Sequence, residues 1–468
     1  MLTGYHVLWG YLPLVLAASW ALFAEFLPGR DRGSAWFGAA MSALSAVLFG
    51  ISQANVTLFG DKLYYATDSR LLAVGIAALA AIWMLWTADR ATGRVREAVA
   101  LAAFSAMGAV LMASAFDVVI MALALELASM PAYVLVGYRR NRIAGLEGAI
   151  KYFLLSVLTT LFMLYGLSFV YGLSGTTSYQ GIANLADTPL STIAVLLVLV
   201  GIFAKLSAAP FHYWAPDAYE GAEPWAVAFV ATVPKIGGIA VAVRLLVALS
   251  YSSAVLPAVL AAVAIASMVL GAFAAISQAD IRRMMAYSSV VNSGYMLIPL
   301  ATLTATSAAG TGALTSSSAT IATTLYVVIY AFATMAVMLI VASEGGRIVD
   351  VAGLVKRRPA AAWGLAIALL SLIGVPPMAG FFGKFYLFMV GVMGGQLIAV
   401  VVATVVSVVS AFYYLRIVKS AFFGVGEEDL APAAPRTWGG AAAIAIAVVV
   451  TVGLGPASGI VMNWMGSL

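Results

Sequence analysis

The feature that most constrains this chain is a series of long apolar segments that runs through its whole length. The chain has 468 residues, of which 63% are hydrophobic and only 9% are charged, whereas a soluble domain carries about 25% charged residues. A bilayer core of about 30 Å is crossed by roughly 20 apolar residues in a helix. The composition therefore predicts an integral membrane protein rather than a set of soluble domains.

Fourteen segments are long and apolar enough to cross the membrane. Lipid-exposed backbone must satisfy its own hydrogen bonds, and the period-two alternation of barrel strands is missing, so these segments are expected to be helices. We predict an all-α polytopic membrane protein without a soluble domain. The segments are 5–27, 35–59, 69–88, 96–115, 117–138, 147–173, 190–213, 222–248, 253–276, 281–302, 318–342, 360–395, 397–423 and 438–462.

The basic residues predict the orientation of the chain. When each connection is numbered by the helix before it, 17 basic residues lie at odd connections and only Lys62 and Arg70 at even ones. Basic loops face the cytoplasm. Odd connections are therefore expected in the cytoplasm, and both termini on the outer side of a bacterial or archaeal cytoplasmic membrane. The seventh connection is the exception, because it carries Asp217, Glu220 and Glu223 but no basic residue.

Four charged residues lie deep inside predicted spans, where an ionisable group costs several kcal/mol and is a candidate for function. Lys235, for example, is roughly 20 Å into its span at 1.5 Å per residue. The alternative is a structural role, in which the charge holds helices together. The four candidates are Glu126, Lys205, Lys235 and Lys384.

Three further charges lie nearer the ends of spans. Lys151 follows Glu147 by four residues, and its depth suits a group on the cytoplasmic side better than a direct partner of Glu126; the alternative is a side chain that reaches the lipid headgroups. Arg244 is expected to reach the outer headgroups, and Asp117 to be solvated.

Two spans contain prolines that should break them. Pro210 and Pro216 interrupt the seventh segment over Ala208–Pro216, and GVPP interrupts the twelfth at Pro376 and Pro377, because proline cannot donate to the helix ladder. Broken helices at membrane depth line protein or water cavities and mark ion paths in transporters.

The breaks lie five helices apart, which predicts two five-helix repeats of inverted topology. The predicted parts are residues 1–95 with three helices, the repeats at 96–248 and 253–423, and a last helix in 424–468.

Buried charges of this kind suit a proton relay, since making and breaking ion pairs can load and release a proton. Asn292 lies about 16 Å into the tenth segment with Tyr287 and Ser288 beside it, and polar helix packing is the alternative to a role in a water chain. His212 can feed the path from the cytoplasmic mouth or make a structural hydrogen bond.

No cofactor or metal site is expected in this chain. It has no cysteine, which excludes disulfides, iron–sulfur clusters and thiolate zinc sites. Its two histidines, His6 and His212, are too far apart in the sequence to suggest haem ligation. Nothing in the sequence indicates a redox centre, a nucleotide loop or a nucleic-acid partner.

Five motifs together resemble the antiporter-like membrane subunits of respiratory complex I, the proton-pumping NADH–quinone oxidoreductase, and among these the N subunits. The resemblance covers at least 126–390. The motifs are ELASMPAYVLVGY, EGAIKYFLLS, AKLSAAPFHYWAPDAYEGAEPWAVAFVATVPK, RRMMAYSSVVNSGY and GVPPMAGFFGKFYLF.

The resemblance implies a role for each candidate. Glu126 and Lys205 match the pair that modulates pumping, and Lys151 matches the lysine of the sixth helix. Lys235 matches the central lysine, and Lys384 the group that hands the proton to the outer side.

The same resemblance implies a non-redox, translocating subunit within a hetero-oligomer of membrane-arm subunits in the lipid bilayer. The quinone site, FMN and iron–sulfur clusters would then belong to partner subunits.

One position departs from the pattern. Family members usually have histidine where this chain has Asn292, and an amide carries no proton charge at physiological pH. The resemblance then requires the proton transfer at this position to pass through water or to be absent.

Other functions stay open on the sequence alone. A subunit of a multisubunit sodium–proton antiporter or of a membrane-bound hydrogenase shares the family, and a stand-alone secondary transporter is a third reading. The neighbouring genes would distinguish a complex I subunit from an antiporter or hydrogenase subunit. Purification of the chain as a functional protein by itself would favour the stand-alone transporter. The electron donor and the quinone type are not encoded in this chain.

Overall fold

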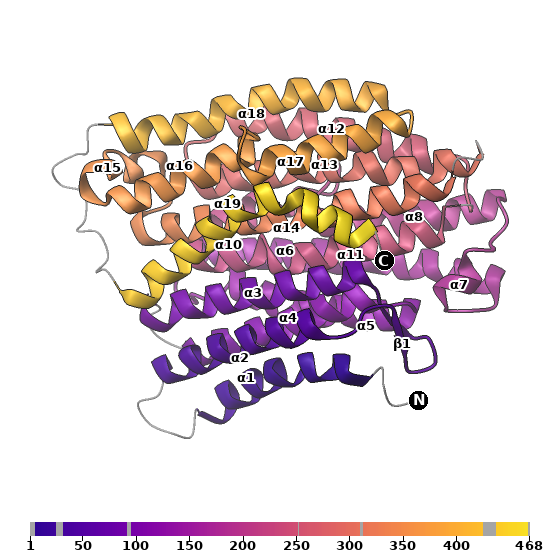
Figure 1. Cartoon of the computed structure of the whole chain (residues 1–468), viewed down its shortest axis with the longest axis horizontal. Coiled ribbons are helices and arrows are strands. Elements are labelled where there is room, and N and C mark those ends of the chain that lie inside the picture. The colour runs from indigo at the N-terminus through magenta and orange to yellow at the C-terminus, as the bar shows by residue number, and fades with distance from the viewer. Residues whose placement is uncertain are drawn as a thin grey trace.

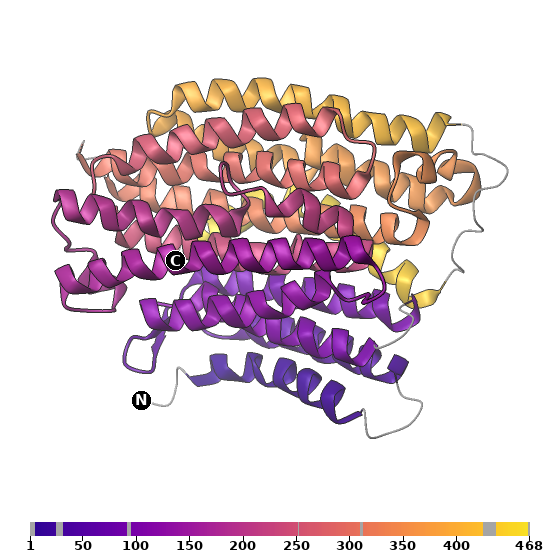
Figure 2. The same cartoon turned by 180° about the vertical axis from the view of Figure 1, so that it is seen from behind.

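The computed structural model describes residues 5–24, 31–90, 95–250, 252–308, 312–424 and 437–466. Three of the basic residues counted above, Arg30, Arg94 and Arg436, lie outside these ranges. Within the described residues, long helices lie side by side in a single bundle (Figures 1 and 2). The prediction of an all-α polytopic membrane protein is confirmed.

In the part of the chain that the structure describes, 12 helical segments are long and apolar enough to span a membrane. α13 and the pair α16–α17 occupy the tenth and twelfth predicted segments, so each of the fourteen predicted segments contains helix. The repeat relation between them stays a prediction.

The N-terminal part contains one clear difference from the sequence prediction. The second helix was expected over 35–59, yet it ends at Ile51, and a short antiparallel hairpin follows. The tip FGD takes left-handed backbone at Phe59, Gly60 and Asp61, a conformation that a helix cannot contain. The elements are η1 (Tyr5–Gly10), α1 (Leu12–Phe23), α2 (Asp31–Ile51), β1 (Val56–Leu58), β2 (Leu63–Tyr65) and α3 (Thr67–Arg90).

The first predicted repeat contains both a predicted and an unpredicted interruption. The expected break between α8 and α9 is present, but the expected single helix over 222–248 is divided in two before Pro234. The elements are α4 (Val95–Ser114), α5 (Val118–Val136), α6 (Ile143–Ser174), α7 (Tyr179–Ile182), α8 (Pro189–Leu206), α9 (Trp214–Gly221), α10 (Pro224–Val230) and α11 (Val233–Ala248).

The second predicted repeat contains the break at GVPP, where α16 ends and α17 begins. The elements are α12 (Leu256–Ile276), α13 (Ile281–Ala308), α14 (Gly312–Glu344), η3 (Ile348–Val351), α15 (Leu354–Arg357), α16 (Pro359–Ile373), α17 (Ala379–Met393) and α18 (Leu397–Phe423). The last helix, α19 (Trp438–Gly466), crosses in front of the bundle and contacts α3, α14 and α17 (Figure 1).

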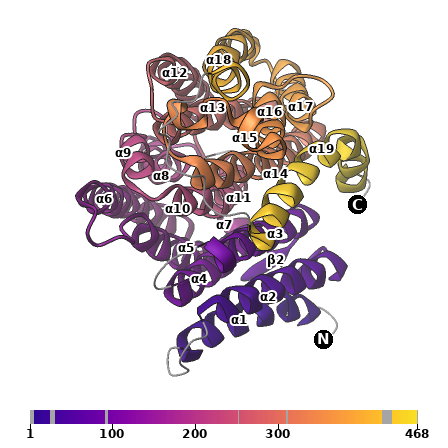
Figure 3. The same ribbon diagram turned by 90° about the vertical axis from the view of Figure 1, so that its left-hand side faces the viewer.

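The most buried helices lie at the centre of the bundle. In the end-on view, α11 and α14 lie between the α12–α18 group and the N-terminal helices (Figure 3), and 94% of the apolar window in each of these two spans is buried. The two ends of the bundle differ. We call the end with α15 and α9 the odd-loop end (Figure 3), and the end with β1 and α7 the hairpin end (Figure 1).

Candidate functional site

The break in the first predicted repeat covers residues 207–213, between α8 and α9. Ser207 ends α8 in the left-handed conformation with φ 57°, and the Ala209–Pro210 peptide bond is cis. Pro216 was expected to end regular backbone, but it lies in the first turn of α9. A proline is tolerated there, because the first turn of a helix needs no amide donor.

The carbonyl groups at the end of α8 are satisfied without the lysine beside them. Trp214 Nε1 donates to the Ala204 carbonyl at 3.0 Å, and Ser293 Oγ donates to that of Leu206. Lys205, in the last turn of α8, is therefore free to reach α5. Its Nζ donates to Ser129 Oγ at 2.7 Å and to Tyr133 Oη at 3.1 Å.

Glu126 lies on the same helix as those hydroxyls, three residues before Ser129. It lines a surface groove of about 450 Å³ between α5 and α6. Within the described residues, the structure joins Glu126 and Lys205 by no ion pair, so the pairing implied by the resemblance stays a prediction.

Lys235 is buried in the first turn of α11, with 5% of the residue exposed. Its Nζ donates to the Ser289 carbonyl at 2.9 Å and to Ser289 Oγ, and it lies 5.1 Å from the centroid of the Tyr330 ring. Lys205 and Lys235 line the same small cavity, of about 10 Å³. A cavity of that size holds about one water molecule. The structure therefore brings these two predicted residues together.

Lys384 is equally buried but has different surroundings. It lies in α17, and its Nζ donates back across the break to the carbonyl of Ile373, the last residue of α16, at 2.9 Å. It also donates to Ser407 Oγ at 3.1 Å and lies 4.9 Å from the centroid of the Tyr295 ring. Gly374 ends α16 with φ 90°, a left-handed conformation.

Asn292 lies on α13 between the positions of these lysines. Its amide Nδ2 donates to the Ser288 carbonyl at 2.8 Å, and its Oδ1 accepts from Tyr326. Ser288 therefore belongs to the same network. Tyr287 is half-buried, and its backbone and Val291 face Gly271 of α12, so it lies on another side of α13.

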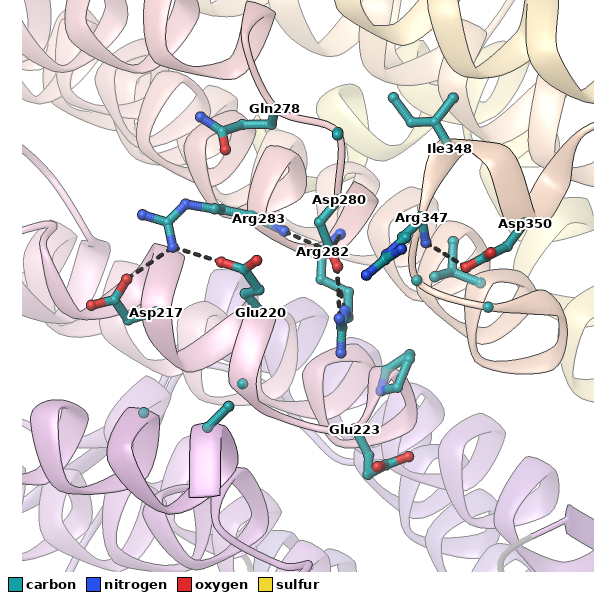
Figure 4. A pocket seen from close by; sticks show the side chains of 18 of the residues that line it. Asp217, Glu220, Glu223, Gln278, Asp280, Arg282, Arg283, Arg347, Ile348 and Asp350 are labelled. Carbon is teal, nitrogen blue, oxygen red and sulfur yellow. Dashed lines mark hydrogen bonds and ion pairs between the residues drawn. The ribbon is translucent and has the colours of Figure 1, made fainter. Parts of the chain in front are cut away.

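At the odd-loop end, a cavity of about 1310 Å³ opens between the two halves of the bundle. We call it the vestibule. Arg283 Nη1 donates to Asp217 Oδ1 at 2.9 Å and to Glu220 Oε2 at 2.7 Å (Figure 4). Asp217 Oδ2 accepts from Lys151 Nζ at 2.7 Å. The acidic seventh connection is thus neutralised by cations from neighbouring helices, which explains its exception to the charge pattern.

Lys151 was expected on the cytoplasmic side, and it lines the vestibule at the odd-loop end. It is paired with Glu147 and Asp217 rather than extended alone into the headgroup region. His212, by contrast, is absent from the residues that line the vestibule. It is 7% exposed, stacks on Tyr213 within the break, and has an Nδ1 without a hydrogen-bond partner.

At the hairpin end, two expectations from the sequence, for Asp117 and Arg244, are wrong. Asp117 was expected to be solvated, but it is buried, caps α5 and accepts hydrogen bonds from Lys62 and Thr177. Arg244 was expected among headgroups, but its side chain is 8% exposed and pairs with Asp68 at 3.3 Å. Lys62 of the hairpin connection pairs with Asp117, and Asp68 in the first turn of α3 pairs with Arg244, contacts that hydropathy along the chain does not reveal.

Sequence reasoning missed a group of buried tyrosines between Lys235 and Lys384. We call Tyr295, Tyr326, Tyr330, Tyr413 and Tyr414 the tyrosine cluster; each is at most 2% exposed. Tyr326 and Tyr330 are four residues apart in a predicted span, a spacing that places both on one helix face. That spacing was the signal in the sequence. Among the described residues, no group of three or more histidine or acidic side chains could hold a metal ion.

Comparison with known proteins finds a family and several relatives. Residues 115–410 match the family model described as NADH:quinone oxidoreductase/Mrp antiporter, TM. The chain is 37% identical over 449 residues to NADH-quinone oxidoreductase subunit N 1 of Acidiphilium cryptum, covering 92% of this chain and 91% of that protein. It is 36% identical over 386 residues to the subunit N of Rhodospirillum rubrum, covering 80% and 76%.

Solved structures show the same fold. A chain of respiratory complex I from Thermus thermophilus is 30% identical with a TM-score of 0.82, covering 97% of this chain and 98% of that one. A chain of an archaeal membrane-bound sulfane sulfur reductase has a TM-score of 0.86 at 21% identity, covering 98% and 96%. A chain of the Mrp complex from Dietzia has a TM-score of 0.79 at 19% identity, covering 100% and 97%.

Proposed function

The chain belongs to the NADH:quinone oxidoreductase/Mrp antiporter family of membrane subunits, and from that premise we propose how its buried charges act. It is a proton-translocating membrane-arm subunit of an NADH–quinone oxidoreductase. Its place is in a multisubunit membrane complex. The relatives that carry the subunit N name are 36–37% identical, whereas the antiporter and sulfur-reductase chains share only the fold.

We propose that Lys205, Lys235 and Lys384 are successive proton-binding groups. The observation that carries this proposal is the cavity that Lys205 and Lys235 share, because both residues line it and its volume suits about one water molecule. A proton that enters through the vestibule, past Lys151, reaches this lysine pair, and it leaves through Lys384. Each lysine gains one proton from the group before it and gives one to the group after it.

Glu126 belongs to the proposal as the group that biases Lys205. Its carboxylate lies in a groove at the surface of α5 and α6, where a neighbouring subunit can change its surroundings. An approach of Glu126 toward Lys205 would stabilise the ammonium, and withdrawal would release the proton. His212 is a further titratable group, and it lies in the break between α8 and α9.

The remaining assignments follow the relatives. We propose that NADH is the electron donor of the complex, and that the quinone site, FMN and iron–sulfur clusters lie in partner subunits. The chain acts as a translocase without a redox centre of its own. Its odd-loop end faces the cytoplasm, and both termini lie on the outer side of the cytoplasmic membrane, as the basic residues predict.

Replacement of Lys235 by methionine in the assembled complex tests the proposal. The change removes the ammonium and keeps most of the side-chain volume. Proton pumping in liposomes is expected to be lost, and quinone-coupled electron transfer to slow with it. Lys419→Met, at an exposed lysine near the odd-loop end, is the matched control and should leave both rates unchanged. Normal pumping by the Lys235 variant would contradict the relay.

A further inference from the structure

The tyrosine cluster occupies the space between two lysines of the proposed relay. Its members come from three helices: Tyr295 from α13, Tyr326 and Tyr330 from α14, and Tyr413 and Tyr414 from α18. Apolar side chains would fill such a space at a lower free-energy cost, because each buried hydroxyl needs a hydrogen-bond partner. Five hydroxyls in one buried region therefore call for an explanation beyond packing.

Asn292 connects two of these tyrosines through a continuous set of hydrogen bonds. The Tyr326 hydroxyl donates a hydrogen bond to Asn292 Oδ1, and Asn292 Nδ2 lies 3.3 Å from Ser288 Oγ. Ser288 Oγ is in turn hydrogen-bonded to the Tyr414 hydroxyl. We call Ser288, Asn292, Tyr326 and Tyr414 the hydroxyl hub. Its four members join α13, α14 and α18.

One side of the hub adjoins Lys235. The Lys235 ammonium is bonded to Ser289, the residue that follows Ser288 on α13. The ring of Tyr330 lies 5.1 Å from the same ammonium, a distance at which a cation is attracted by the face of an aromatic ring. Lys235 therefore contacts Ser289 and Tyr330, which lie next to the hub on α13 and α14, and among the described residues none of its hydrogen-bonded neighbours is acidic.

The other side of the hub adjoins Lys384. A Cβ added at Gly383 would lie 2.6 Å from the Tyr326 ring, so this ring packs directly against the backbone beside Lys384. The Lys384 ammonium lies 4.9 Å from the centroid of the Tyr295 ring. Tyr326 therefore spans the distance from Asn292 to the helix that carries Lys384.

Three hydroxyls of the cluster make no hydrogen bond of ordinary geometry among the described residues. Those of Tyr295, Tyr330 and Tyr413 are buried, and the nearby polar groups are hydroxyls: Ser407 beside Tyr295, Ser289 beside Tyr330 and Ser410 beside Tyr413. Buried polar groups in proteins are normally completed by internal water. Water bound to these hydroxyls would extend the hub in the direction of both lysines.

We propose that the hydroxyl hub, together with water, carries protons between Lys235 and Lys384 in place of a titrating side chain at position 292. This inference rests on the proposed function and names the groups of its central step. The Lys235 ammonium gives a proton to the first water or hydroxyl, and each oxygen passes on its own proton as it accepts one. The last oxygen gives its proton to the neutral Lys384 amine, so no phenolate forms and charge balances. Asn292 is the positioning residue, since its amide fixes the directions of Tyr326 and Ser288.

Removal of the hub hydroxyls one at a time tests this inference. Tyr326→Phe and Tyr414→Phe are introduced into the complete complex, and protons pumped per electron pair are measured in liposomes in H₂O and D₂O. Tyr65→Phe is the matched control, because Tyr65 is also fully buried and donates to a carbonyl, that of Phe49, at 3.1 Å. We expect about a fivefold loss of pumping in each hub variant, the effect of one lost buried hydrogen bond, with a larger D₂O effect, and no change in the control.

Ser288→Ala covers the case in which a tyrosine variant fails to assemble, since it removes the other half of the Ser288–Tyr414 bond with a smaller change. If the hub works as a unit, the Ser288→Ala, Tyr414→Phe double variant is no worse than either single variant. Asn292→His should restore pumping to an otherwise impaired Tyr326→Phe chain.

The outcomes separate this inference from the function on which it rests. Normal pumping in both tyrosine variants, or losses equal to that of the Tyr65 control, overturns the hub while Lys235→Met still abolishes pumping. Normal pumping in Lys235→Met as well contradicts the proposed function itself.

Discussion

The two broken helices hold their lysines on opposite halves of the break. Lys205 lies before the break, in the last turn of α8, whereas Lys384 lies after it, in α17. Both lysines nevertheless relate to the carboxyl end of the first half-helix, which carries partial negative charge. Lys205 belongs to the last turn of α8, and Lys384 donates to the carbonyl that ends α16.

What differs is the group that satisfies the exposed carbonyls. At the first break, Trp214 and Ser293 donate to the end of α8, and Lys205 donates to hydroxyls of α5 instead. At the second break, Lys384 and Ser407 donate to the Ile373 carbonyl themselves. Lys384 is therefore part of the fold as well as of the proposed path, and Lys205 is much less so.

Among the changes that test this comparison of the two breaks, the largest effect is expected from Lys384→Met. The variant removes the ammonium of the second break and weakens the cap of α16, so both pumping and thermal stability of the complex should fall. We expect roughly a hundredfold loss of pumping, the size of a lost acid–base group. An unchanged melting temperature of the variant complex would show that Ser407 alone satisfies the end of α16. The claim that Lys384 stabilises the fold would then be wrong.

Lys205→Met should lower pumping by only about tenfold, because Lys235 lines the same cavity and can still receive a proton through water. Stability should change little, since Trp214 and Ser293 keep the end of α8 satisfied. The measurements are the same as for Lys384. A loss of stability as large as that of Lys384→Met would mean that the two breaks are built alike after all.

Exchanging the residue types that end α8 and α16 tests the left-handed backbone conformation at these two positions. Gly374→Ser is expected to destabilise the complex by about 1 kcal/mol, because the left-handed conformation at φ 90° disfavours a side chain. Its Cβ would also lie 3.2 Å from Cδ of Lys384. Ser207→Gly, at φ 57°, should be neutral or slightly stabilising. Thermal unfolding of the purified complex measures both, and the opposite order would contradict the assignment.

The smallest effect concerns pH at the vestibule. Burial raises the pKa of Asp217, but hydrogen bonds from Lys151 and Arg283 outweigh it, so the pKa of this carboxyl is below its usual value. Its ionised form therefore stabilises the fold above about pH 4 and is lost as pH falls further.

Asp217→Asn should lower stability by about 1 kcal/mol or less at neutral pH, as for a partly exposed ion pair, and this difference should shrink below about pH 4. Melting curves of the complex at several pH values test this. A difference that stays constant down to pH 3 would show that the ion pairs of α9 do not support the first break.

The breaks could be predicted because proline acts through covalent geometry, which is local. Pro210 and Pro376 lie in the two breaks as expected, although Pro131 and Pro299 lie inside continuous helices. The deep lysines could be predicted for a similar reason, since an ammonium in a spanning helix stands out in any context. The fourteen segments followed from hydropathy alone.

The partners of those charges could not be predicted, because they depend on which helices meet. Nothing near Asp117 in the sequence indicates that Lys62 lies beside it, and nothing near Arg244 indicates Asp68. The tyrosine cluster was missed for the same reason. Its members are spread over 120 positions, from Tyr295 to Tyr414, and only the packing of α13, α14 and α18 gathers them.

The shared carboxylate of Asp217 has a consequence for how sequences of this kind can change. One oxygen serves Lys151 of α6 and the other serves Arg283 of α13, so one residue is tied to both halves of the bundle. A substitution at 217 removes one acid from two cations at once and leaves Lys151 with Glu147 and Arg283 with Glu220, and a change at either cation leaves the carboxylate to the other. We therefore expect these three positions to covary, so that a related sequence that differs at one of them carries a matching change at another.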